Sequence, residues 1–245
     1  MYHHLKTLFW TTRVDRIALA IIGVALLVRL CIAFLPVTVL GPWFVPDDAF
    51  YYFKISQNVA SGVGSTFDGE HLTNGYHPLW MLVVAGSMAI FSGIGEMAPV
   101  HALLILSALL STITFILLYA IARRLFTHPA PRIAVIALIA LSPIQIGWTT
   151  NGLETALVGL VVVALAAFPI FYGAGRWPIS RLVIWGALGG LMILARTDYG
   201  LFPFLLSLWY LWRNRREFWR TALALALPAI LVVLPWVLWS WYALG

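Results

Sequence analysis

Long apolar runs dominate this chain and decide what it can fold into. Seven runs approach the roughly 20 residues that cross a bilayer, for which about 17 is the lower limit. Of all residues 62% are hydrophobic and only 10% are charged, whereas about a quarter of a soluble domain is charged. We therefore predict an all-α, polytopic membrane bundle of about seven spans. They are residues 17–40, 99–122, 133–149, 154–172, 182–196, 199–212 and 221–243.

An eighth apolar stretch, residues 79–91, is too short for a span and fits an interfacial or re-entrant helix better. The basic residues support this interpretation. With a cytoplasmic N-terminus and no crossing at 79–91, twelve of the fifteen Lys and Arg lie inside, as the positive-inside rule requires. The large loop 41–98 is then predicted to face the periplasm or the extracellular side. The twelve are Lys6, Arg13, Arg16, Arg123, Arg124, Arg132, Arg176, Arg181, Arg213, Arg215, Arg216 and Arg220.

The net charge of +6 does not indicate nucleic-acid binding, because the basic residues form short clusters between apolar runs. Neither a P-loop nor the glycine pattern of dinucleotide-binding folds is present. The chain is therefore expected to be an integral membrane protein that contacts membrane lipids and binds no nucleic acid.

An acidic pair opens the chemistry-bearing part of loop 41–98. Asp47 and Asp48 follow Pro46, and carboxylates are favourable at a helix N-terminus. Apolar spacing of i, i+3, i+4 and the following Gly62 predict an amphipathic helix over residues 47–61 along the membrane surface. One Asp would suffice as a cap, and two adjacent ones point in different directions. Helix cap and catalytic carboxylate both stay open as interpretations.

Glu154 lies in the loop between the third and fourth predicted spans, on the same predicted face as Asp47. It is interpreted either as a favourable charge at the start of the fourth span or as part of a site with the acidic pair. Asp47, Asp48 and Glu154 together could bind a divalent cation. The scattered His and carboxylates do not have the spacing of a dedicated zinc site, and we predict none.

Three basic residues are candidates for binding a phosphate. Arg196 lies at the outer end of the fifth run, and its planar guanidinium suits phosphate. Asp198 could pair with it, although residues at i, i+2 do not face each other on a helix. Arg29 lies close to the middle of the first run, where snorkelling reaches poorly, so we expect it to face the bundle. His77, in the outer loop, could donate to a phosphate.

Four segments together resemble a known family: PDDAFYY at 46–52, TNGYHPLW at 73–80, LSP at 141–143 and NGLET at 151–155. With them the chain resembles the GT-C superfamily of membrane glycosyltransferases. It is similar to the bacterial branch related to protein mannosyltransferases and to the aminoarabinose transferase of lipid A. The resemblance extends over essentially the whole chain.

The resemblance implies an enzyme of a bacterial-type plasma membrane that takes a sugar from a polyprenyl-phosphate donor. The acceptor would be a hydroxyl of a glycan, lipid or protein, and the transfer would invert the anomeric centre. Asp47 or Asp48 and Glu154 match the family's two acidic positions, and Asp47 is expected to take the proton of the acceptor hydroxyl. In the aromatic-rich loop, Tyr51, Tyr52 and Asn74 are expected to bind substrate. No cofactor is required.

Family members usually continue with further spans. Residues 1–245 are therefore expected to form a single module, as a fragment, a truncated product or a minimal unit. Two alternatives stay open. A transporter or flippase would place charges near mid-depth, often within inverted repeats. A non-catalytic scaffold subunit would be indifferent to replacement of Asp47.

Overall fold

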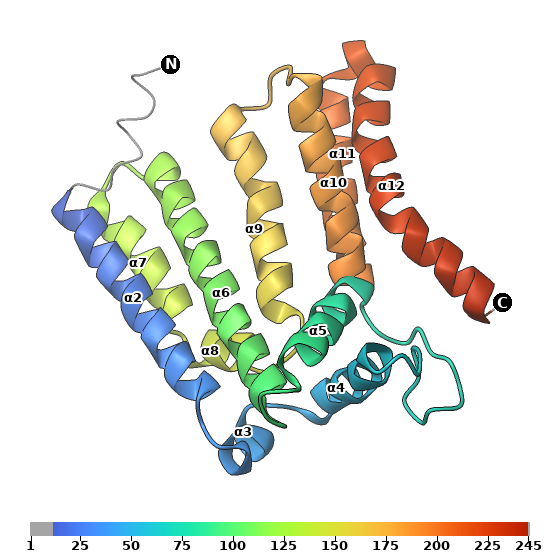
Figure 1. Cartoon of the computed structure of the whole chain (residues 1–245). Coiled ribbons are helices and arrows are strands. Elements are labelled where there is room, and N and C mark those ends of the chain that lie inside the picture. Colours follow the sequence, from blue (N-terminus) through green and yellow to red (C-terminus); the bar gives the residue numbers. More distant parts are fainter. Residues whose placement is uncertain (1–11, 245) are drawn as a thin grey trace.

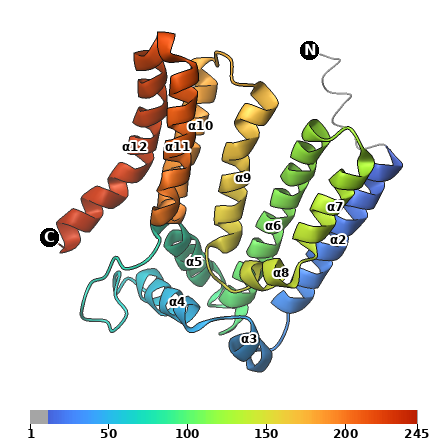
Figure 2. The same cartoon turned by 180° about the vertical axis from the view of Figure 1, so that it is seen from behind.

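The computed structural model describes residues 12–244, and Lys6 of the predicted cytoplasmic cluster lies outside them. The described chain is a bundle of helices with no strand longer than an isolated bridge, which confirms the all-α prediction. Seven helices run side by side (Figures 1 and 2). They are α2 (Arg13–Ala33), α6 (Ala98–Leu125), α7 (Pro129–Ala140), α9 (Thr155–Tyr172), α10 (Ile179–Ala195), α11 (Leu201–Arg213) and α12 (Phe218–Leu244).

Four helices of the described chain, α2, α6, α9 and α12, are long and apolar enough to cross a membrane. Helix α7 and the following α8 (Pro143–Thr149) meet at a bend of 52° and would count together as a fifth span. Helix α10 has 17 residues and α11 has 13. At 1.5 Å per residue both are shorter than a hydrocarbon core of about 30 Å. The predicted count of seven spans therefore stays a prediction for these two helices.

Two predicted spans are each divided by a proline. The run 17–40 was expected as one helix, but α2 ends at Ala33 and the short helix α3 (Val37–Trp43) begins only after Pro36. The run 133–149 likewise breaks before Pro143, where the Ser142 side chain accepts a hydrogen bond from the Gln145 N–H and caps α8. Continuous helices were the wrong prediction here, because the residue before a proline is disfavoured in the α conformation.

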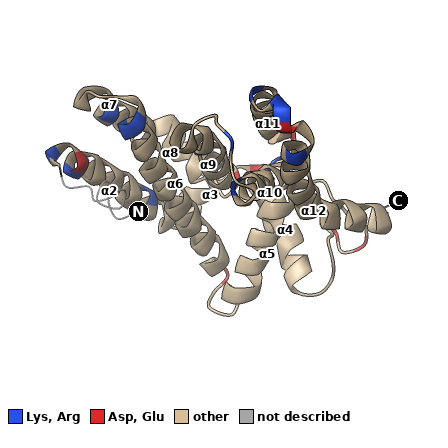
Figure 3. Ribbon diagram, turned by 90° about the horizontal axis from the view of Figure 1, so that it is seen from above, with Lys and Arg blue, Asp and Glu red and all other residues tan. Residues whose placement is uncertain are grey.

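The two ends of the bundle differ in character. Helices α3, α4 (Asp47–Ala60), α5 (Pro78–Phe91) and α8 lie at one end, which we call the site end (Figure 1). The loops that follow α6, α9 and α11 lie at the opposite end with the start of α2. Figure 3 looks onto that opposite end and shows Lys and Arg at the tips of α2, α7 and α11. The arginine-rich loops thus share one end of the bundle, as predicted. That this end faces the cytoplasm stays a prediction.

Glycines bring α10 and α12 into close contact. A Cβ on Gly186 would lie 2.3 Å from the carbonyl oxygen of Leu225, and one on Gly190 would lie 2.8 Å from that of Ala229. Small residues at such a crossing allow two membrane helices to pack backbone to backbone. This packing fixes α10, at whose end Arg196 enters the site.

Candidate active site

Gly152 allows the loop before α9 to pack closely against the surface helix α4. Gly152 has a φ of +78°, and a Cβ there would lie 3.1 Å from the ring of Phe53 on α4. The indole N–H of Trp80, a fully buried residue of α5, donates to the Gly152 carbonyl at 3.0 Å. Segment 151–154 is therefore held by both α4 and α5, and a larger residue at position 152 would separate them.

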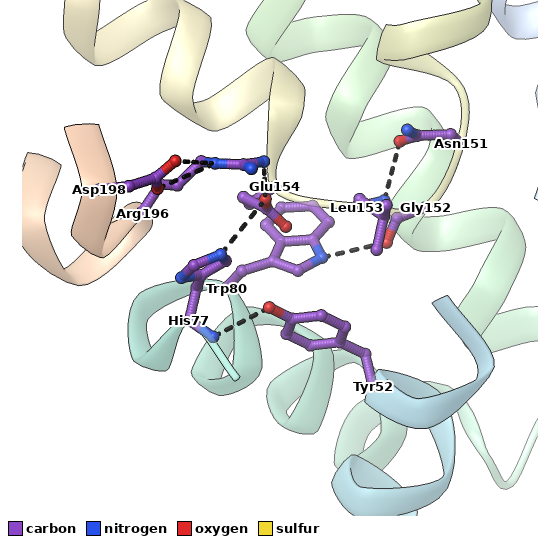
Figure 4. A network of polar contacts seen from close by, with 9 residues as sticks. All are labelled: Tyr52, His77, Trp80, Asn151, Gly152, Leu153, Glu154, Arg196 and Asp198. Atoms are coloured by element: carbon purple, nitrogen blue, oxygen red, sulfur yellow. Dashed lines mark hydrogen bonds and ion pairs between the residues drawn. The ribbon is translucent and has the colours of Figure 1, made fainter. Parts of the chain in front are cut away.

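Glu154 is buried at the site end and is 3% exposed. Arg196 donates from Nη1 to Glu154 Oε1 at 2.9 Å, and His77 Nε2 lies 3.8 Å from the same oxygen (Figure 4). The Glu154 side chain makes no capping hydrogen bond to α9. Glu154 does occupy the N-cap position of α9, where a negative charge is favourable, and the hydrogen-bond partner of its side chain is the arginine.

The Arg196 guanidinium is held by two carboxylates. Its Nε donates to the carboxylate of Asp198 at 3.1 and 3.3 Å. Asp198 thus pairs with Arg196, one of the possibilities open from the sequence, and the i, i+2 spacing allows it because α10 ends at Ala195 and Arg196 has extended backbone angles. Partial burial lowers the pKa of the guanidinium, but Asp198 and Glu154 raise it by more. Arg196 thus stays charged, with a side chain that is 39% exposed.

Tyr52 connects the surface helix to the start of α5. Its hydroxyl accepts a hydrogen bond from the His77 N–H at 2.9 Å, which fixes the residue before Pro78 (Figure 4). Burial raises the pKa of the Tyr52 hydroxyl, which the His77 hydrogen bond offsets only in part, and the charge of Glu154 raises it further. The hydroxyl therefore stays protonated at neutral pH and keeps a hydrogen to donate.

These groups surround a cavity of about 540 Å³, a size typical of ligand sites. Seven of the ten predicted site residues line it. They are Asp48, Tyr51, Tyr52, Asn74, His77, Glu154 and Arg196. The sequence missed Ile55, Gly75, Tyr76, Leu153 and Thr197. Four of these five are chain neighbours of predicted residues, so adjacency is the signal that could have found them.

Three predicted site residues lie outside this cavity. Asp198 contacts it only through Arg196. Asp47 turns to the other side of α4, and its carboxylate accepts a hydrogen bond from the Asp48 N–H at 3.0 Å. Arg29 is fully buried inside the bundle, as expected for a residue that avoids lipid, and its hydrogen-bond partners are protein atoms.

Within residues 12–244, no three His, Cys, Asp or Glu side chains lie close enough to share a metal ion. Asp47 and Asp48 face different cavities, and Glu154 is occupied by Arg196. The structure thus gives no support to the predicted divalent cation at these three carboxylates.

Comparison with protein-family models decides the class of this site. The model described as dolichyl-phosphate-mannose-protein mannosyltransferase matches residues 77–239, about two thirds of the chain. The chain belongs to this family. The match includes His77, Glu154, Arg196 and Asp198, and it begins after the acidic pair. Neither the curated proteins nor the solved structures give a significant match.

Membership makes the chain an integral membrane glycosyltransferase of the GT-C type, whose donor is a polyprenyl-phosphate-linked sugar. The cavity at the site end suits such a donor. Its lining includes the fixed guanidinium of Arg196, the carboxylate of Asp48 and the hydroxyl of Tyr52. A leaving phosphate and an acceptor hydroxyl could both be bound there.

Proposed function

We propose that this protein transfers a sugar from polyprenyl phosphate to an acceptor hydroxyl in the cavity lined by Asp48, Glu154 and Arg196. One observation carries the proposal. The same cavity is lined by the carboxylate of Asp48 and by Arg196, whose guanidinium is held in place by the carboxylates of Glu154 and Asp198. A general base and a phosphate-binding cation are the two groups that this transfer requires.

The chemistry is a single displacement. The acceptor oxygen forms a bond to the anomeric carbon while the bond from that carbon to the phosphate oxygen breaks. Asp48 accepts the proton of the acceptor hydroxyl. Arg196, with His77 beside it, stabilises the charge on the departing polyprenyl phosphate, which needs no general acid. Attack opposite to the leaving group inverts the anomeric configuration.

Asp48 is the better candidate for the base than Asp47. It lines the same cavity as Arg196, whereas Asp47 faces the other side of α4. The clustering of basic loops at the opposite end supports a site on the periplasmic or extracellular face, with the N-terminus in the cytoplasm. The family match favours this transferase over the transporter, flippase and scaffold alternatives.

The test is sugar transfer by the purified protein in lipid nanodiscs. Radiolabelled polyprenyl-phosphate sugars, mannose first, are incubated with membrane extract as the acceptor source. We expect Asp48→Asn to lower transfer by at least about 100-fold, the usual contribution of a general base. Glu70→Gln is the matched control, because Glu70 is an exposed carboxylate of the same loop that lines none of the cavities described here.

Two results would contradict the proposal. One is wild-type protein that consumes no polyprenyl-phosphate donor. The other is an Asp48→Asn variant that transfers sugar at the wild-type rate, which is the behaviour of a scaffold. Loss of transfer in Glu70→Gln as well would point to a folding defect of the loop.

A further inference from the structure

A second cavity lies against the same surface helix. It has a volume of about 550 Å³ and is lined by α4, by residues of α3, α5 and α6, and by Phe67 of the loop after α4. Tyr51 lines both cavities, so the two adjoin at this side chain. Helix α4 presents Asp48 to the first cavity and Asp47 to the second.

The helical repeat explains how α4 serves both cavities. Residues 48, 51, 52 and 55 form one stripe at i, i+3, i+4, i+7 spacing and line the first cavity. Residues 47, 50, 51, 54 and 57 form a neighbouring stripe and line the second. A third stripe, with Ala49, Phe53 and Ser56, is buried in the core, and Phe53 also forms part of the wall of the second cavity. A ligand in the second cavity would therefore lie directly beside the donor site.

The second cavity combines exposed aromatic rings with polar groups that lack protein partners. Phe50, Tyr51 and Phe67 are each about half exposed, and the Tyr51 and Phe67 ring centres are 5.0 Å apart. Among the described residues, the side chains of Lys54 and Glu96 make neither a hydrogen bond nor an ion pair.

The loop that carries Phe67 is fixed by a buried amide. Asn58 of α4 donates from Nδ2 to the Thr66 carbonyl at 2.8 Å and to the Phe67 carbonyl at 3.4 Å. Asp68 accepts hydrogen bonds from the N–H groups of Glu70 and His71 at 2.9 Å, which closes the following turn. The Phe67 ring is thus held beside Tyr51 before any ligand arrives.

We infer that this second cavity binds a neutral carbohydrate, which is the acceptor of the transfer; the inference rests on the proposed function. The C–H faces of a sugar ring pack against aromatic rings such as Phe67 and Tyr51. Its hydroxyl groups both donate and accept, so they satisfy the ammonium of Lys54 and the carboxylates of Asp47 and Glu96 together. A hydroxyl that extends past Tyr51 reaches Asp48 in the donor cavity.

Other acceptor classes fit this cavity less well. An anionic headgroup would find a single ammonium, that of Lys54, against the two carboxylates of Asp47 and Glu96, and like charges at close range are costly. A hydrocarbon chain would leave these polar side chains buried without partners. An extended peptide that binds by strand addition needs a free strand edge, and the described walls of this cavity are helices and the loops that carry Val45, Phe67 and Glu96.

The test measures binding separately from transfer. The protein in nanodiscs is titrated with methyl mannobioside, methyl cellobioside and methyl chitobioside, and binding is followed by saturation-transfer difference NMR. We expect at least one of them to bind, and Phe67→Ala to weaken it about 3- to 10-fold, as loss of one aromatic contact would. Phe126→Ala is the control, since Phe126 is an exposed aromatic residue of the α6–α7 loop, outside both cavities.

Further variants separate this inference from the proposed function. Asp48→Asn should lose transfer but bind the disaccharide within about threefold of wild type, because Asp48 meets only one acceptor hydroxyl, which Asn can still hydrogen-bond, and lines the other cavity. Asp47→Asn should raise the acceptor KM more than it lowers kcat. Gln57 lines the second cavity from α4, so Gln57→Ala should weaken binding as Phe67→Ala does. A loss in both variants cannot be explained by a misfolded loop around Phe67. The inference is overturned if no disaccharide binds, if Phe67→Ala and Gln57→Ala bind normally, or if a serine-containing hexapeptide displaces the sugar.

Discussion

Two arginines of the bundle, Arg29 and Arg196, have different structural surroundings and therefore different roles. Arg29 is completely buried. It donates from Nε to Thr149 at 2.9 Å and from Nη1 to the carbonyl oxygens of Ala25 and Ala140 at 3.0 Å each. Its guanidinium also lies 4.9 Å from the centre of the Phe115 ring. Apart from the bond to Ala25 within α2, the contacts of Arg29 thus connect helices to one another.

Arg196, in contrast, is held by carboxylates and opens onto a cavity. The carboxylates of Glu154 and Asp198 fix its Nη1 and Nε atoms, while 39% of the side chain stays accessible. The difference teaches that an ionisable residue at membrane depth is not by itself a binding site. What distinguishes Arg196 is an adjoining cavity and a geometry fixed by neighbours of opposite charge.

The largest expected effect separates the two arginines by activity. Arg196→Ala should lower kcat/KM for sugar transfer by about 100- to 1,000-fold, because a fixed donor to the developing phosphate charge is lost. Arg29→Ala, measured per folded molecule, should stay within about threefold of wild type. Equal losses in both variants would break the distinction.

The loss of folding free energy should show the opposite order, with a larger loss for Arg29→Ala than for Arg196→Ala. Arg29→Ala removes the buried hydrogen bonds to the Thr149 hydroxyl and to the carbonyl oxygens of Ala25 and Ala140, which should cost about 1–3 kcal/mol. Arg196→Ala removes the partner of the buried Glu154 carboxylate, but Glu154 lines the cavity, so water can replace the lost hydrogen bond and the variant should cost less, about 1 kcal/mol. The midpoint of thermal unfolding in nanodiscs, followed by circular dichroism, measures both. A lower midpoint for Arg196→Ala than for Arg29→Ala would contradict this expectation.

Substitution of a carboxylate that holds Arg196 should lower kcat/KM more when that carboxylate is buried than when it is exposed. Glu154→Gln weakens a buried, charge-assisted hydrogen bond and should lower kcat/KM about tenfold, mainly through a higher KM for the donor. If Glu154 were instead the catalytic base, the loss would fall on kcat and approach that of Asp48→Asn. Steady-state kinetics with varied donor concentration distinguishes the two roles.

Asp198 should give the smallest effect. Its side chain is 60% exposed, and ion pairs of exposed groups contribute little. Asp198→Asn should therefore change kcat/KM less than about threefold in the same donor titration. A loss as large as that of Glu154→Gln would show that Asp198, too, is needed to hold Arg196 in place.

Much of the fold follows from short-range patterns. Pro46 followed by two Asp predicted the start of α4 at Asp47, and the structure confirms it. The breaks at Pro36 and Pro143 carried a readable signal in the prolines themselves. The breaks were missed because the residues before and after each proline are equally apolar, as expected of helices that face lipid, so the hydrophobic run continues through the break.

The site was only partly predictable. Topology correctly placed Asp48 and Glu154 at the same end of the bundle. The pairing of Arg196 with Glu154 was not foreseen, because the two residues are separated by 42 positions and meet only through the packing of α9 and α10. The division of the acidic pair between two cavities depends on the rotation of α4 about its axis. That rotation is set by contacts such as Phe53 on Gly152.

Binding of the leaving group tests the central claim most directly. Polyprenyl phosphate is titrated onto wild type, Arg196→Ala and Arg29→Ala in nanodiscs, with polyprenol as the ligand that lacks phosphate, and native mass spectrometry measures occupancy. We expect Arg196→Ala to weaken polyprenyl phosphate binding at least about tenfold, the loss of one charge-assisted contact. Polyprenol binding and the Arg29→Ala variant should be unaffected. Unchanged phosphate binding by Arg196→Ala, or an equal loss in Arg29→Ala, would contradict the assignment of this cavity as the donor site.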